Sequence, residues 1–261
     1  MIGLGSNRLS VCRRGGMSVT QAGRGGMEWL AGGRMPSWSQ WWLPYSRQAG
    51  EALKAQFPTQ WPTIRDYGFA HPEIVPYVNA NPLGWGGYIA YCDALERIEF
   101  GSNGMIDTGI VGGSNICTYL DAYVDGNVQW IIAGLGSNSN LRYAVLNGAS
   151  YTSVRFQYGS YNNTSIMNKL SGRHTFEINL GKFLVDGVLK AQATNTFTSD
   201  GVIRIGTHST EGDASINYMY GCKIWNGATN TPLRELLPCK LKSNNQLGAW
   251  DLVGAEFIPT T

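Results

Sequence analysis

The last part of the chain, residues 220–258, alternates between apolar and polar side chains in short runs. Breaks rich in Asn, Gly and Pro separate these runs. Successive side chains of a β-strand point to opposite faces, so a period of two indicates a strand with one buried face. The alternation predicts half-buried antiparallel strands in the runs 222–225, 233–237, 240–242 and 249–252.

The same pattern extends back to about residue 95. Short runs recur every 8–12 residues, and the pairs Asp125-Gly126 and Asp186-Gly187 are two-residue hairpin signals. Regular short strands divided by turn residues are typical of a sandwich or barrel. The predicted strands are 95–100, 105–110, 115–124, 127–133, 141–146, 151–157, 165–170, 173–180, 182–185, 188–190, 202–207 and 217–225.

Four groups of residues, in this order, resemble motifs of LamG-like, concanavalin A-like jelly-roll domains found in bacteriophage structural proteins and gut-bacterial surface proteins. They are LERIEFGSNGMIDTGI at 95–110, RHTFEINLGKFLVDG at 173–187, KIW at 223–225, and LLPC at 236–239 followed by GAWDLV at 248–253. The resemblance covers about 93–261. It implies an all-β fold, a two-sheet jelly-roll sandwich at 88–261. It also implies a binding or structural module, because most such domains are not enzymes.

Residues 1–87 differ in composition from the rest. They hold six of the nine tryptophans and seven of the ten prolines, and glycine pairs recur in the first 35 residues. Prolines prevent long helices, and glycine pairs make flexible backbone. Only 47–57 has helical spacing. We therefore expect an irregular, extended arm that becomes ordered against the β domain or neighbouring subunits. The residues predicted to anchor it are Trp29, Trp38, Trp41, Trp42 and Trp61.

Some relatives of this fold hydrolyse glycosides with paired carboxylates, so the acidic residues of the predicted strands bear on whether the chain is an enzyme. Their E-x-D-x-x-E strand motif does not occur in this chain. Glu96 and Glu99 are three residues apart and would face opposite sides of a strand, and Asp121 lacks partners. His174 lies on the matched strand, where a structural role is expected. These patterns predict a protein that is not an enzyme.

Residues 158–164 combine aromatic, amide and hydroxyl side chains, as sugar-binding surfaces do. An ordinary surface turn has the same composition. The predicted glycan contacts are Tyr158, Tyr161, Asn162 and Asn163.

No cofactor is expected, with Ca²⁺ at the sandwich rim as the one alternative. Hard oxygen ligands for it could come from aspartates, none of them at EF-hand spacing. They are Asp107, Asp121, Asp125, Asp200 and Asp213. The five cysteines show no metal-ligand spacing and read as small buried hydrophobes.

Charge and hydropathy argue against nucleic acid and membranes as partners. The net charge is +2, and five arginines without lysine in the first 35 residues are a modest basic segment, so nucleic acid is not an expected partner. No run of about 18 apolar residues is present, so no membrane partner is expected.

The function expected from the resemblance is a non-enzymatic structural component of a tailed-phage virion, as a capsid decoration, fibre or tail adhesion protein. Residues 1–87 would anchor it to other virion proteins or to copies of itself, in an oligomer. The jelly roll would be displayed outward to bind host-surface glycans. The alternative is a lectin-like, carbohydrate-binding protein on a bacterial cell surface.

Overall fold

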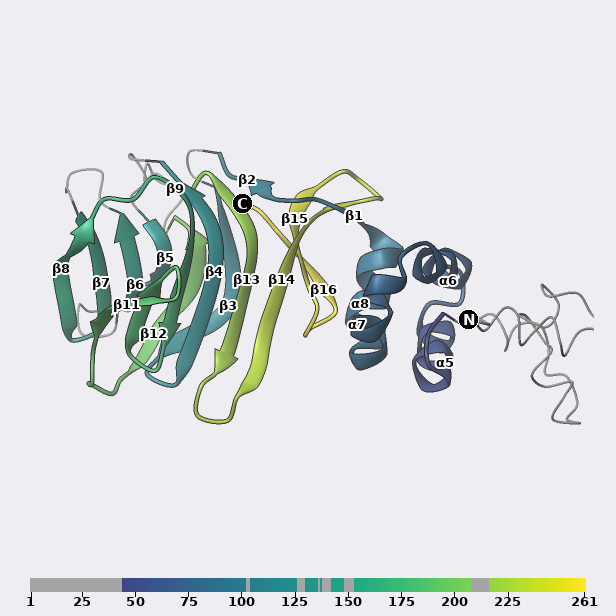
Figure 1. The fold of residues 1–261 in the computed structure, drawn as a ribbon, viewed down its shortest axis with the longest axis horizontal. Helices are drawn as coiled ribbons and strands as arrows, with labels where there is room; N and C mark the ends of the chain where they lie inside the picture. The colour runs from purple at the N-terminus through teal and green to yellow at the C-terminus, as the bar shows by residue number, and fades with distance from the viewer. Residues whose placement is uncertain are drawn as a thin grey trace, which may run out of the picture. The chain divides into compact units, whose positions relative to one another are not determined.

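The computed structural model describes residues 44–101, 104–125, 130–135, 137, 142–147, 153–207 and 216–261, without the side chains of 164 and 165. The chain divides into two compact units, Met1–Pro82 and Leu83–Thr261 (Figure 1). Each unit is described by itself below. The boundary lies at Pro82 and Leu83, five residues before the predicted one.

The described part of the first unit is helical. It contains α5 (Arg47–Gln56), α6 (Trp61–Ala70), the 3₁₀ turn η2 (Pro72–Ile74) and α7 (Val75–Ala80). The prediction of an irregular arm is therefore wrong for residues 47–80, except that 47–57 does form the expected helix. Three of the prolines occupy first turns, where a missing N–H costs no helical hydrogen bond. Proline density marked helix starts here, and it kept each helix at ten residues or fewer.

A small apolar core holds these helices together. The Tyr45 hydroxyl donates to the carbonyl of Ile64 at 2.7 Å, and a Cβ on Gly68 would lie 2.5 Å from the Tyr45 ring. Ser46 caps α5 by accepting from the amide of Ala49. The buried apolar residues of this unit are Tyr45, Ala49, Leu53, Phe57, Trp61, Ile64, Ile74 and Val78.

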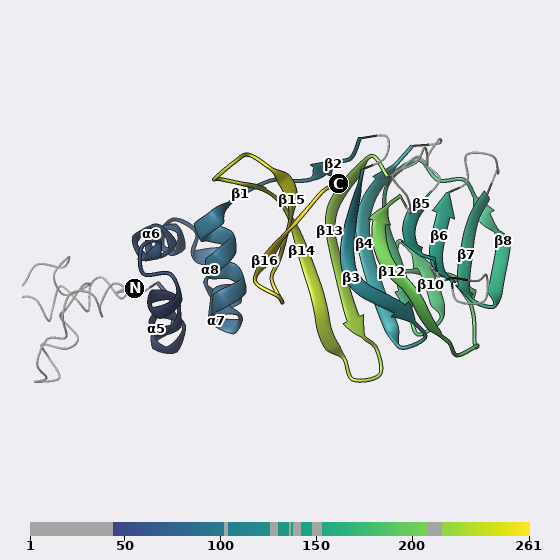
Figure 2. The same cartoon turned by 180° about the vertical axis from the view of Figure 1, so that it is seen from behind.

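The second unit is a sandwich of two antiparallel sheets, as predicted (Figures 1 and 2). The larger sheet has the order β11-β10-β9-β4-β13-β14-β15-β16, and β1 and β2 pair with β14 and β13. The smaller sheet has the order β3-β12-β5-β6-β7-β8. Among the described residues these sheets contain ten and six strands. The main core, including Ile98, Ile106, Leu120, Phe156, Phe176, Phe183 and Ile203, lies between them.

The larger sheet is built from β1 (Cys92–Ala94), β2 (Ile98–Glu99), β4 (Ile116–Val124), β9 (Gly172–Asn179), β10 (Lys182–Val185), β11 (Val188–Gln192), β13 (Tyr218–Asn226), β14 (Thr231–Leu241), β15 (Leu247–Asp251) and β16 (Glu256–Pro259). The smaller one is built from β3 (Met105–Gly113), β5 (Trp130–Gly134), β6 (Arg142–Asn147), β7 (Ser153–Gly159), β8 (Tyr161–Asn168) and β12 (Thr198–Gly206). All predicted strands have a counterpart, while β1 and β16 were not predicted.

Strand β14 passes through Pro238, where the alternation predicted two separate strands. On one side β14 pairs with β15 throughout this stretch. On the other side β13 pairs with β14 up to Leu236, and β1 takes over from Cys239. Pro238 therefore sits where the partner strand changes, and its carbonyl accepts from the amide of Leu95. A proline is tolerated at such a gap because no ladder hydrogen bond needs its missing N–H.

Helix α8 (Pro82–Tyr91) packs on the face of β14 and β15 that points away from the smaller sheet. The indole Nε1 of Trp250 donates to the carbonyl of Gly84 at 2.8 Å. Lys242 Nζ donates to the carbonyl of Ile89 at the last turn of the helix. The buried residues of this second cluster are Tyr88, Cys92, Cys239, Trp250 and Leu252. Because α8 from Leu83 onward belongs to the sandwich unit, the predicted domain 88–261 cuts through this helix.

Substituting Gly87 by Ala should loosen α8 from the sheet. A Cβ there would lie 2.3 Å from the Trp250 ring, so the helix or the indole must shift. We expect a loss of about 1–3 kcal/mol in the free energy of unfolding, measured by urea denaturation. Gly101→Ala is the matched control, since a Cβ at Gly101 meets nothing within 4 Å. Equal stability of the two variants would contradict this packing.

Candidate functional site

Strand β4 carries a half-buried polar side chain at every second position. Tyr119, Asp121 and Tyr123 alternate with buried residues that face the core. The neighbouring strands extend this row, because Arg173 of β9 and Tyr218 of β13 both lie opposite Tyr123. We call the resulting surface the tyrosine face; it consists of Tyr119, Tyr123, Tyr218, Tyr220, Arg97, Asp121 and Arg173.

Tyr220 lies two residues after Tyr218 on β13, at an irregularity of the strand. The register to β4 shifts between Met219 and Gly221, so Tyr220 has no partner residue in β4. A bulge of this kind re-aims a side chain and is common next to binding sites. Strand alternation places Tyr220 on the same face as Tyr218, and after the bulge the core-facing positions continue at Cys222 and Ile224.

Arg173 links Asp121 and Tyr220. Its Nε and Nη2 donate to Oδ1 and Oδ2 of Asp121 at 2.9 and 2.8 Å, a bidentate ion pair. The guanidinium carbon also lies 3.7 Å from the centroid of the Tyr220 ring. The hydrogen bond to Asp121 raises the pKa of Arg173. The Arg173 side chain remains 52% exposed while that of Asp121 is 21% exposed, so the carboxylate holds a guanidinium that faces solvent.

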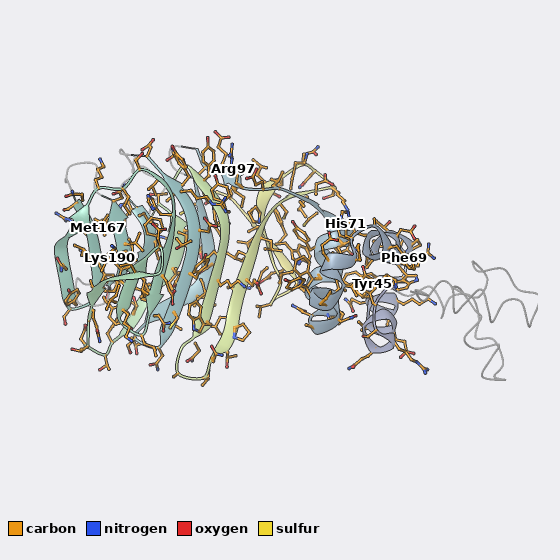
Figure 3. All side chains as sticks on the ribbon, viewed as in Figure 1. Tyr45, Phe69, His71, Arg97, Met167 and Lys190 are labelled. Atoms are coloured by element: carbon orange, nitrogen blue, oxygen red, sulfur yellow. The ribbon has the colours of Figure 1, made fainter. Side chains whose placement is uncertain are left out.

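Arg97 makes a second stack beside the first. It lies between β1 and β2, where Figure 3 labels it, and its guanidinium carbon is 4.2 Å from the Tyr218 ring centroid. A hydrogen bond with Tyr220 raises the pKa of Arg97. Tyr123 contacts Tyr218 edge to face, with centroids 5.6 Å apart. Two arginines and three tyrosines thus form one connected array of planar groups.

Acidic groups lie near both arginines of this array. Arg173 is neutralised by Asp121. The negative charge of Glu96 also raises the pKa of both Arg97 and Arg173. Beside them Lys223 pairs with Glu235 at 2.7 Å. Burial raises the pKa of Tyr119, so its phenol stays neutral at physiological pH. The surface therefore offers fixed aromatic rings and oriented hydrogen-bonding groups with little net charge.

The predicted glycan loop does not form a single surface. Tyr158 and Tyr161 lie opposite each other and pack around Phe156 on the core side of the sheet. Tyr158 is 1% exposed, its hydroxyl donates to the carbonyl of Ser114, and burial raises its pKa to about 12. The prediction of Tyr158 as a surface contact is wrong for this reason.

The two predicted asparagines also separate. Asn162 is exposed and accepts from Gln157 at 3.3 Å, on the side of the sheet that faces away from the core. Asn163 is half-buried and donates to the Tyr161 hydroxyl. Successive side chains of a strand point to opposite faces of the sheet. The composition of 158–164 does not show this alternation, so it did not predict that the two asparagines separate. Whether Asn162 contacts a sugar stays a prediction.

Of the five predicted anchoring tryptophans, the structure describes one. Trp61 begins α6 and is buried at 8% exposure in the core of the helical unit. It packs within its own chain, so its ring is not an exposed anchor. Trp29, Trp38, Trp41 and Trp42 lie outside the described residues. Their role in assembly stays a prediction.

The aspartates considered for Ca²⁺ have other partners where they are described. Asp107 pairs with Arg204, Asp200 accepts from the amide of Ser137, and Asp125 is hydrogen-bonded to Asn217. Asp213 lies outside the described residues. In the part of the chain that the structure describes, no three His, Cys, Asp or Glu side chains are grouped to hold a metal ion.

His174 ties strand β9 to the Asp186-Gly187 hairpin, and both belong to the matched motif at 173–187. Its Nδ1 lies 2.8 Å from Oδ2 of Asp186, and the amide of Thr175 donates to Oδ1 of Asp186 at 2.9 Å. Asp186 and Gly187 have φ values of +52° and +73°, which a tight Asp-Gly turn requires. His174 is therefore a structural contact of this turn.

No protein-family model matches the chain, and no curated protein matches it significantly. None of the helices within the described ranges is long and apolar enough to span a membrane. The tyrosine face was missed from the sequence because its residues come from four separate segments. The T-Y-L-D-A-Y-V and Y-M-Y alternations at 118–124 and 218–220 were the signal that could have indicated part of it.

The Asp186 contacts predict a pH-dependent loss of stability. Burial alone would raise the pKa of Asp186, but the hydrogen bonds from His174 and Thr175 lower it. A lowered folded-state pKa stabilises the protein above the unfolded value of about 4, and this contribution disappears as the pH falls through the folded value. Asp186→Asn should cost about 0.5–1 kcal/mol at pH 7, since the group is half exposed.

The difference between the wild type and Asp186→Asn should close below about pH 4, measured by urea unfolding across the pH range. Asp93→Asn serves as a control at an exposed aspartate of β1 and should leave stability unchanged. A difference that stays constant down to pH 3 would show that the Asp186 charge is not involved.

Proposed function

We propose that this chain is a non-enzymatic adhesion protein of a tailed-phage virion, whose sandwich binds a surface glycan at the tyrosine face. The observation that carries the proposal is the array in which Arg173 and Arg97 stack on Tyr220 and Tyr218 while Asp121 holds Arg173 in a bidentate pair. Sugar sites combine aromatic rings with planar hydrogen-bonding groups held in fixed positions.

Charge pairing favours a hydroxyl-rich ligand over a polyanion. A surface that binds phosphates offers unpaired cations, whereas both arginines here have acidic neighbours. Hydroxyl groups can donate to the carboxylate and accept from the guanidinium of one ion pair. The stacking also fixes the arginine side chains before a ligand arrives, which reduces the entropy cost of binding.

The virion setting rests on the resemblance of residues 93–261 to LamG-like domains of phage structural proteins. In this proposal residues 1–82 attach the protein to other virion proteins or to copies of itself. The second candidate, a lectin-like protein of a bacterial surface, would use the same tyrosine face and differ in what holds the protein in place.

Glycan-array binding of the full chain tests the ligand class. Tyr220→Ala should weaken binding at least about tenfold, because it removes the ring that contacts both arginines. Tyr77→Ala is the matched control, a tyrosine 62% exposed in the helical unit, and should bind like wild type. Circular dichroism verifies that both variants are folded. Binding that Tyr220→Ala leaves unchanged would exclude this face.

Particle incorporation tests the setting separately. Deleting residues 1–82 should abolish incorporation into the virion while glycan binding persists, because the sandwich unit begins at Leu83. The measurement is the amount of protein in purified particles against the full-length chain. Normal incorporation of the truncated protein would overturn the anchoring role of residues 1–82.

A further inference from the structure

Two cysteines meet beneath helix α8. Cys92 is the first residue of β1, directly after the last residue of the helix, and Cys239 lies in the neighbouring strand β14. The register pairs Ala94 with Cys239 and Cys92 with Leu241, so the two cysteines are diagonal neighbours on one face of the sheet. Diagonal neighbours on adjacent antiparallel strands share a face of the sheet and lie about 7–8 Å apart along the backbone, with their Cβ atoms somewhat closer.

The two thiols contact each other in this position. A hydrogen bond between them lowers the pKa of Cys92 and raises that of Cys239. Lys242 further favours the Cys92 thiolate. Both residues are buried, at 5% and 0% exposure, among Tyr88, Trp250 and the rest of the cluster under α8. Both thiols are free in the structure.

The other two described cysteines provide a contrast. Cys117 pairs with Trp225 and Cys222 with Leu120, three positions apart along the β4–β13 ladder. Cys117 lies beside Asn179, and Cys222 belongs to the core between the sheets. Within the part of the chain that the structure describes, neither is hydrogen-bonded to another cysteine. Packing explains these two, whereas the Cys92–Cys239 contact brings two thiols together.

We propose that Cys92 and Cys239 form a disulfide bond in an oxidising medium, which fixes helix α8 on the ten-stranded sheet. Cys92 directly follows the helix, so the bond would join the helix end covalently to β14. The proposal is independent of the ligand of the tyrosine face.

The oxidant is a small disulfide such as oxidised glutathione, and the exchange balances in two steps. The Cys92 thiolate attacks one glutathione sulfur, the glutathione disulfide breaks, and one glutathione thiolate leaves as a mixed disulfide forms on Cys92. Cys239 then loses its proton and attacks the Cys92 sulfur, which releases the second glutathione. The product is one protein disulfide and two glutathione thiols.

The bond should form slowly in the native protein, because α8 covers both sulfurs. It should form readily when the reduced, unfolded chain refolds in a glutathione redox buffer, where both sulfurs are accessible. It closes a loop of about 150 residues, so it should raise Tm by roughly 5–15 °C relative to the reduced protein.

The experiment refolds the full chain in that buffer and maps its tryptic peptides without reduction. We expect a cross-link between the peptide ELLPCK, which contains Cys239, and the peptide that contains Cys92. Cys239→Ala should lose both the cross-link and the gain in Tm. The double variant Cys117→Ala, Cys222→Ala should keep both relative to its own reduced form.

Two results would overturn the proposal. One is that Cys92 and Cys239 remain free thiols in the most oxidising buffer at which the protein still folds. The other is that either cysteine is found bonded to glutathione or to a different cysteine. Because the cross-link is read directly from peptides, a variant that folds poorly does not decide the outcome.

Discussion

The ten-stranded sheet has two faces to cover, and the rest of the sandwich unit follows from how each is covered. One face packs against the six-stranded sheet through the main core. The opposite face is divided. Over β14 and β15 it carries Trp250 and Cys239, which helix α8 buries. Over β4 and β13 it carries tyrosines, whose rings are covered in part by arginines of the same unit. The large side chains on this face are covered by helix α8 in one part and by arginine side chains in the other.

The motif W-D-L-V at 250–253 and the preceding Ala249 contribute to both faces of the ten-stranded sheet. Ala249 points to the main core, and Trp250 points to α8. Asp251 is fully buried, and its oxygens accept from Arg234 and from the amides of Glu235, Val253 and Gly254. A buried carboxylate is stable only when its lone pairs are satisfied in this way. The motif thus joins β14, β15 and the turn after it, which explains why these residues occur together.

Period-two alternation predicted the sandwich because one face of each strand must be buried. That requirement leaves an alternating pattern within each short segment of the sequence. Predictions from short segments were wrong where one residue type occurs in two structural settings. A proline that breaks a helix can also begin one, and Pro62 and Pro76 lie in the first turns of α6 and α7, so proline content alone does not distinguish irregular chain from short helices. Tyr158 has the composition of a sugar contact, yet its ring fills the core and only its hydroxyl is polar. The tyrosine face depends on β-strand neighbours distant in sequence, and a single strand pattern does not name them.

The half-buried rings of the tyrosine face bear on the proposed ligand. A solvent-facing strand surface is stable with small polar side chains, and large rings there leave apolar area in water. Trp250 in the same sheet shows the alternative, since a helix buries it to 5% exposure. On the tyrosine face the guanidinium groups cover ring surface while Arg173 itself stays half exposed and charge-paired. A hydroxyl-rich ligand can complete that cover without breaking the Arg173–Asp121 pair, whereas an apolar partner would have to desolvate the pair. The geometry therefore favours a polar ligand over a hydrophobic one.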